Sequence, residues 1–126
     1  KPIPKGTERL GKALLDAAFQ VHTHLGAGFI ERVYEDALCH ELSLREVPFQ
    51  RQVMIDVSYK GLHIRGQRLD LVVGGRVIAE LKSVKAIESV HQAQLISYLK
   101  ASNLHLGYIV NFNVPRLRDG LKRMVV

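Results

Sequence analysis

The sequence predicts an α/β domain in which helices flank a mixed β-sheet. Apolar residues recur at helical spacing in the first third of the chain and again around residue 95. Between and after these segments, runs rich in Val, Ile and Leu are typical of strands. The order helix, helix, three strands, helix, strand predicts one domain over residues 1–126, in which residues 1–6 are a flexible tail.

Two helices are expected before the first strand. Residues 7–25 carry apolar side chains at helical spacing, Thr7 is a suitable N-cap, and the glycine-rich segment 26–28 ends the helix. Residues 29–47 show the same spacing as far as Pro48, and the residue before a proline is disfavoured in a helix.

The remaining elements follow from the same criteria. Alternating or continuous apolar residues predict four strands, at residues 50–59, 62–73, 76–82 and 106–112. Residues 87–102 return to helical spacing, and residues 122–126 are expected to form a short edge strand.

Composition favours a polyanionic partner. The 126 residues have a formal net charge of +6, which suits binding to nucleic acid. The sequence contains no run of about 18 apolar residues, so no membrane span is expected. The single cysteine, Cys39, lies on the apolar face of the second helix, where a packed thiol is expected. The N-terminus lacks the apolar core of a signal peptide, so a cytoplasmic location is expected.

A small charged set stands inside apolar strand sequence. It consists of Asp70, on the second strand, and of Glu80 and Lys82, which flank Leu81 on the third. Charges in such places cost desolvation energy unless they are paired, hydrated or bound to a metal. Two carboxylates on adjacent strands suit Mg²⁺ or Mn²⁺, and a nearby lysine could orient an attacking water.

The turn between the two strands decides whether the acids face each other. A two-residue turn at positions 74–75 would set Asp70 opposite Ala79, and the acids would point to opposite faces. A three-residue turn or a bulge would set Asp70 directly across from Glu80, and glycine permits the positive φ that such a turn requires. A metal site therefore predicts the longer turn or a bulge. The alternative is a salt bridge between Asp70 and Lys82, with Glu80 solvated.

The second helix offers further acids. Glu31 and Glu35 are four residues apart and share a face, and Glu31 falls at the margin of the apolar stripe, where it could lean toward the sheet. Glu41 lies nearer the centre of that stripe and is a rival. The simpler interpretation of each is a solvated surface charge.

Two polar residues of the third helix share a face. Gln94 and Tyr98 are four residues apart, and an amide beside a hydroxyl could reach a phosphate or a catalytic acid. The alternative is ordinary surface polarity with a half-buried tyrosine.

Together these residues resemble the PD-(D/E)xK nuclease superfamily, and more narrowly its small GxxExxY branch. The branch motif stands at residues 28–34 as Gly-Phe-Ile-Glu-Arg-Val-Tyr. The resemblance spans about residues 8–125 and continues through Arg68-x-Asp70, Glu80-Leu81-Lys82, Gln94-x-x-x-Tyr98 and Asn111-Phe112. One departure is Leu69, where the superfamily name has proline.

The resemblance implies a restriction-endonuclease-like αβββαβ core preceded by an extra N-terminal helix. By analogy Asp70 and Glu80 would bind Mg²⁺ or Mn²⁺, with Glu31 as a further acid of the metal site and Lys82 as the catalytic lysine. Gln94 and Tyr98 would be auxiliary or substrate-binding residues.

The expected function is metal-dependent hydrolysis of phosphodiester bonds in nucleic acid, DNA before RNA. The alternatives are a non-catalytic nucleic-acid-binding module or accessory subunit with the same fold, and a purely structural ion-pair cluster. No membrane partner is expected, and a homo-oligomer is compatible with the sequence.

Overall fold

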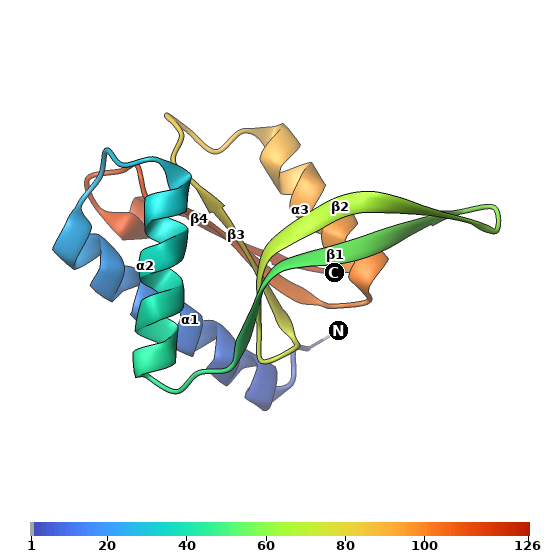
Figure 1. The fold of residues 1–126 in the computed structure, drawn as a ribbon, viewed down its shortest axis with the longest axis horizontal. Helices are drawn as coiled ribbons and strands as arrows, with labels where there is room; N and C mark the ends of the chain where they lie inside the picture. The colour runs from blue at the N-terminus through green and yellow to red at the C-terminus, as the bar shows by residue number, and fades with distance from the viewer. Residues whose placement is uncertain (1) are drawn as a thin grey trace.

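A five-stranded sheet with helices on both faces forms the fold (Figure 1). The computed structural model describes residues 2–126. The elements in chain order are α1 (Lys5–Leu25), α2 (Glu31–Leu44), β1 (Phe49–Tyr59), β2 (Leu62–Val73), β3 (Val77–Lys82), α3 (Ser89–Ser102), β4 (Leu106–Asn111), the 3₁₀ helix η1 (Leu117–Gly120) and β5 (Leu121–Val125). No helix among these residues is long and apolar enough to cross a bilayer.

The sheet is mixed, as the sequence predicts. Its strand order is β1-β2-β3-β4-β5. Only β3 and β4 pair in parallel, and α3 makes the crossover between them, because parallel neighbours cannot be joined by a tight turn. The predicted edge strand at the C-terminus is present as β5, which pairs antiparallel with β4.

The helices bury their apolar stripes against opposite faces of the sheet. α1 and α2 cover one face, and α3 covers the other (Figure 1). Alternation along the strands divides the core accordingly: Leu71 and Ala79 pack with α1 and α2, whereas Val72 and Ile78 pack with Leu95 of α3. Cys39 is buried on the α2 side, as expected, and burial raises the pKa of its thiol to about 11.

Two expectations at the N-terminus are corrected. α1 begins at Lys5 after Pro4 as N-cap, so Thr7 is a buried residue within the helix and not its cap. Of the tail expected at residues 1–6, Lys1 lies outside the described residues, whereas Ile3 packs against the core and Lys5 and Gly6 belong to α1. Proline at the N-cap is compatible with the helix start, since the first N–H groups have no partner within the helix.

The turn between β2 and β3 has three residues. Val73 pairs with Val77, which leaves Gly74, Gly75 and Arg76 in the turn, and both glycines have positive φ, +58° and +71°. The paired register runs as far as Leu71 and Ala79. The next position in that register sets Asp70 across from Glu80, so the longer turn predicted for a metal site is confirmed.

Gly74 is closely surrounded and Gly75 is not. A Cβ at Gly74 would lie 2.6 Å from the Leu10 side chain, whereas a Cβ at Gly75 would meet nothing within 4 Å. Asparagine tolerates positive φ, so Gly74→Asn should lower the free energy of unfolding by about 1–3 kcal/mol through overpacking. Gly75→Asn should change it by less than about 0.5 kcal/mol. Urea denaturation measures both, and equal costs would contradict the packing argument.

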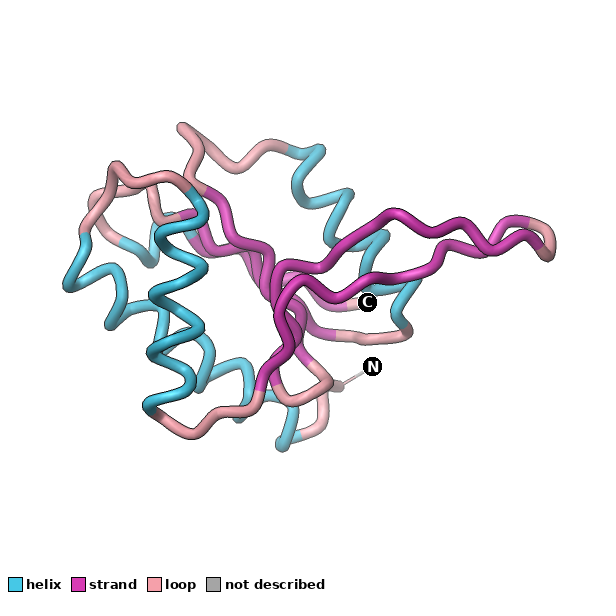
Figure 2. The backbone as a smooth tube through the Cα atoms, in the orientation of Figure 1, coloured by secondary structure: helices cyan, strands magenta, loops and turns pink. Residues whose placement is uncertain are grey.

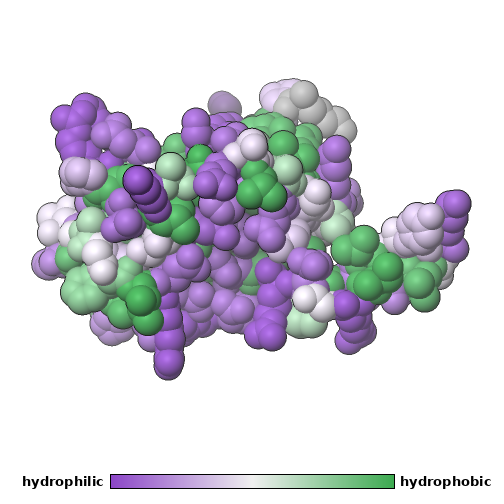
Figure 3. Space-filling model, turned by 90° about the horizontal axis from the view of Figure 1, so that it is seen from above, coloured by the Kyte–Doolittle hydropathy of each residue, from purple (hydrophilic) through white to green (hydrophobic). Residues whose placement is uncertain are grey.

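The far halves of β1 and β2 form an arm that projects from the body (Figure 2). Residues 56–68 are all exposed. Pairing of Val57 with Ile64 and of Tyr59 with Leu62 places four apolar side chains on one face of this arm. Apolar surface is correspondingly visible on the arm in the space-filling view (Figure 3).

Candidate active site

Asp70 on β2 and Glu80 on β3 link the two strands, because the side-chain carboxylate of each accepts a hydrogen bond from the backbone of the other strand. The backbone N–H of Asp70 donates to Oε2 of Glu80 at 2.9 Å, and the N–H of Leu81 donates to Oδ2 of Asp70 at 2.8 Å. These bonds begin where the backbone pairing of β2 and β3 stops, after Leu71 and Ala79. Each carboxylate therefore has one oxygen fixed by a main-chain N–H.

A kink in β1 accompanies this arrangement. Gln52 would face Asp70 across the β1–β2 ladder, but it has φ +53° and does not pair, although Arg51 and Val53 on either side keep their register. Its side-chain amide donates instead to Glu35 of α2 at 2.9 Å. The hydrogen bond between Gln52 and Glu35 therefore connects β1 to α2 at the position across from Asp70.

Burial and mutual repulsion disfavour the charged forms of the two acids. Only 6% of Glu80 is exposed, and burial, with the charge of Asp70 next in size, raises the pKa of Glu80 to about 8. Burial also raises the pKa of Asp70, while the N–H of Leu81 opposes the rise. A bound cation would favour ionisation of both carboxylates, so the site is suited to one.

Lys82 extends the same face of β3. Strand alternation sets it on the side of Glu80, about 6–7 Å further along the strand. Within residues 2–126 it forms no ion pair with Asp70, and Glu80 is buried, so the salt-bridge alternative with a solvated Glu80 is wrong. Its positive charge is nevertheless close enough to oppose the raised pKa of both acids.

Glu31 lies at the end of the sheet, on the α2 side. It is the exposed first residue of α2, and its Oε2 accepts from the N–H of Ser83 at 3.4 Å, directly after Lys82. Its charge reaches Asp70 and Glu80, since it contributes to the raised pKa of both. The rival Glu41 is engaged elsewhere, with Arg45 at 2.7 Å.

Gln94 and Tyr98 approach the acids from α3. Tyr98 is buried, and its hydroxyl donates to Oε1 of Gln67 on β2 at 2.9 Å. Burial, followed by the charges of Glu80 and Asp70, raises the pKa of the Tyr98 hydroxyl. The side chain is therefore within electrostatic reach of both acids, whereas Gln94 itself is exposed.

Three residues near the site escaped prediction as site residues. Glu35 is held by Arg51 and Gln52, and its charge adds more than that of Glu31 to the raised pKa of Asp70. Gln67 receives the Tyr98 hydroxyl. The buried Asn111, opposite Lys82, binds both the N–H and the C=O of Val84 and so fixes the loop after β3. The sequence indicates two of them: Glu35 shares a helix face with Glu31, and Asn111 belongs to the family motif. Nothing in the sequence indicates Gln67.

The donor set of Asp70 and Glu80 fits a hard divalent cation. Each carboxylate keeps a second oxygen, Oδ1 and Oε1, that forms no hydrogen bond among residues 2–126. Mg²⁺ and Mn²⁺ prefer such oxygens and complete their shells with water and substrate phosphate. No group of three His, Cys, Asp or Glu side chains within the described chain is close enough to hold an ion, so Glu31 stands apart from the pair.

Tyr34 shapes the loop that leads to Glu31. Its hydroxyl donates to the C=O of Gly26 at 2.6 Å and accepts from the N–H of Phe29 at 3.2 Å. Its ring stacks on Phe112, with centroids 4.5 Å apart. The tyrosine of the 28–34 motif thus fixes the loop, while the glutamate of the motif points to Ser83.

Removal of this hydroxyl should weaken the loop and leave the ring packing in place. We expect Tyr34→Phe to lower the free energy of unfolding by about 1–2 kcal/mol, because two hydrogen bonds are lost. Guanidinium denaturation measures the cost, with Tyr59→Phe on the exposed arm as the matched control. An unchanged stability in Tyr34→Phe would contradict the role of the hydroxyl.

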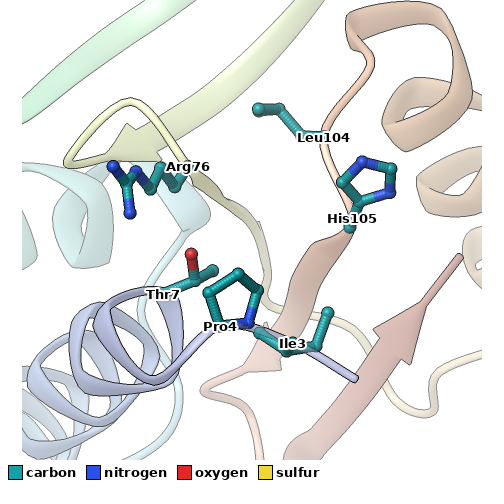
Figure 4. Close-up of a pocket in the computed structure, with 6 residues that line it drawn as sticks. All are labelled: Ile3, Pro4, Thr7, Arg76, Leu104 and His105. Atoms are coloured by element: carbon teal, nitrogen blue, oxygen red, sulfur yellow. The ribbon is translucent and has the colours of Figure 1, made fainter. Parts of the chain in front are cut away.

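A cavity of about 350 Å³ lies at the other end of the parallel strands (Figure 4). It is lined by Ile3, Pro4, Thr7, Arg76, Leu104 and His105. Arg76 precedes β3 and His105 precedes β4, whereas Glu80 and Lys82 stand toward the ends of these strands. The cavity is therefore separate from the acids.

The mixed sheet, the flanking helices and the acid pair define a restriction-endonuclease-like α/β domain. The family model of the PD-(D/E)XK nuclease superfamily matches residues 8–124, and the chain belongs to this superfamily. Its members are typically nucleases that use divalent metal ions. No curated protein and no solved structure matches the chain. Assignment to the GxxExxY branch stays a prediction.

Proposed function

We propose that this protein is a nuclease that requires Mg²⁺ or Mn²⁺ and hydrolyses phosphodiester bonds, in DNA before RNA. The observation that carries the proposal is the placement of Asp70 across from Glu80 by the three-residue turn. Membership of a superfamily of nucleases supports the reaction class. The net charge of +6 supports a polyanionic substrate.

In this proposal Asp70 and Glu80 would hold the cation, since each keeps one carboxylate oxygen that accepts from no main-chain N–H. When bound there, a divalent cation supplies polarisation of the phosphate and a more acidic water. Lys82, on the face of Glu80, orients the attacking water or stabilises the charge that develops on the phosphate. The hydrogen bonds from Asp70 N–H and Leu81 N–H fix both carboxylates for this task.

The remaining predicted residues surround these three. Glu31, tied to Ser83, is proposed as a further acid of the site, which would accept a proton or add negative charge that favours a cation there. Tyr98 and Gln94 are proposed to orient the acids or to contact a phosphate from the α3 side.

The test is cleavage of labelled DNA and RNA oligonucleotides with Mg²⁺, with Mn²⁺ and with EDTA. Cleavage should require the divalent ion, and Lys82→Ala should reduce it by about a hundredfold or more, because a group that acts on the developing charge is lost. Lys100→Ala, an exposed lysine on α3, is the matched control and should cleave normally.

Salt-dependent binding without cleavage in either metal would contradict the nuclease proposal and favour the accessory binding module. Cleavage that persists in EDTA would contradict the metal requirement.

A further inference from the structure

Two apolar side chains stand exposed at the edge of the candidate active site. Phe29 is 46% exposed and Ile30 is 70% exposed, and both directly precede Glu31. The hydroxyl of Ser83 donates to the C=O of Phe29 at 2.5 Å, and the N–H of Ser83 donates to Glu31. Since Ser83 directly follows Lys82, the two apolar side chains lie at the same end of β3 as the proposed catalytic groups.

The loop before α2, residues 26–30, is fixed by aromatic packing and hydrogen bonds to Tyr34. The Phe29 ring meets the Tyr34 ring edge-on, with centroids 6.1 Å apart, and the Tyr34 hydroxyl binds the loop backbone on both sides. Tyr34 in turn stacks on the buried Phe112. The exposed ring of Phe29 is thus supported by two buried aromatic rings, which lowers the entropy lost when a ligand packs on it.

We propose that Phe29 and Ile30 form a stacking surface for one unpaired nucleobase beside the phosphate that is cut. The substrate is then single-stranded nucleic acid or an unpaired end of a duplex. Aromatic side chains stack on any base, but within a duplex both faces of each base are already covered by its neighbours. This inference rests on the proposed nuclease function.

The size and surroundings of the surface favour a base over a protein partner. Two side chains match one base, whereas a stable protein interface buries about 800 Å² on each partner. Ser83, which contacts the C=O of Phe29, directly follows Lys82 and lies two residues before the exposed Lys85, so two cationic residues flank in sequence the segment that meets this surface and could bind the neighbouring phosphates.

The test measures binding apart from cleavage. Single-stranded 12-nucleotide DNA and RNA that contain 2-aminopurine, and a blunt duplex of the same sequence, are titrated with protein at fixed salt, with Ca²⁺ replacing Mg²⁺. We expect the single strands to bind more tightly than the duplex, with quenching of 2-aminopurine. Phe29→Ala should weaken single-strand binding about tenfold and remove the quenching. Phe29→Trp should bind at least as tightly as the wild type.

Leu44→Ser is the control, because Leu44 is also an exposed apolar residue but lies at the opposite end of α2, about 20 Å along the helix. It should bind like the wild type. Unchanged affinity in Phe29→Ala, or preference for the blunt duplex, would overturn the inference while cleavage by the wild type leaves the nuclease proposal standing. A wild type that binds none of the three probes and cleaves none would overturn both.

Discussion

Asp70→Asn should abolish metal-dependent cleavage, with a loss of more than about a hundredfold in rate, while the protein stays folded. The amide keeps an oxygen that can accept from the N–H of Leu81, so the link between β2 and β3 survives. What is lost is the negative charge that, with Glu80, would hold the cation. Initial rates of oligonucleotide cleavage across a Mn²⁺ titration measure the effect.

The matched control is Asp56→Asn on the exposed arm, where the acid pairs only with Arg65 among residues 2–126. Its cleavage should equal that of the wild type. If Asp70→Asn cleaves at the wild-type rate, Asp70 is not part of the machinery and the site lies elsewhere.

Glu80→Gln should make the metal-free protein more stable at alkaline pH, an unusual result for a change at a buried position. The pKa of Glu80 is raised on folding from 4.5 to about 8. The folded state therefore binds the proton more tightly than the unfolded chain, and the contribution to stability falls as the pH rises from about 4.5 to about 8. Glutamine retains an oxygen to accept from the N–H of Asp70 and has no such titration.

In EDTA the two proteins should have similar free energies of unfolding at pH 4.5. At pH 8.5 the variant should be more stable by on the order of a few kcal/mol. Saturating Mn²⁺ should reverse the order, because only the intact carboxylate pair gains stability from the ion. Urea denaturation at both pH values measures this, with exposed Glu46→Gln as control. A variant less stable than the wild type at pH 8.5 in EDTA would contradict the desolvation argument.

Local patterns were enough to predict the elements, because the helices carry apolar residues at helical spacing and the central strands β3 and β4 are short apolar runs that are buried almost throughout. The strand Leu62–Val73 begins and ends where the sequence places it. The second helix ends earlier than expected, at Leu44 and not near Pro48, because a proline excludes helix before it without fixing where the helix stops.

From the sequence, Asp70 and Glu80 are expected to face each other only if the turn between their strands has three residues or a bulge. A Gly-Gly pair suits both two- and three-residue turns, so composition alone does not choose between them. The fold chooses through contacts that are distant in sequence: Gly74 lies against Leu10 of α1, and its N–H donates to the C=O of Pro48 at 2.8 Å.

The surroundings of the acids depend on how whole elements pack. The contact of Glu31 with Ser83 requires the first residue of α2 to meet the segment directly after β3, 52 residues later. The kink at Gln52 places a non-glycine residue at positive φ, which no local pattern indicates. Thr7 is of a residue type that often caps helices, but here it is buried inside α1. Residue type alone does not distinguish these two positions.

A crystal structure of the protein soaked in Mn²⁺ tests the central claim most directly. The claim predicts an anomalous peak bonded to carboxylate oxygens of both Asp70 and Glu80, and its absence in Asp70→Asn treated identically. A peak that contacts neither residue, or no peak at saturating Mn²⁺ above pH 8, would contradict it.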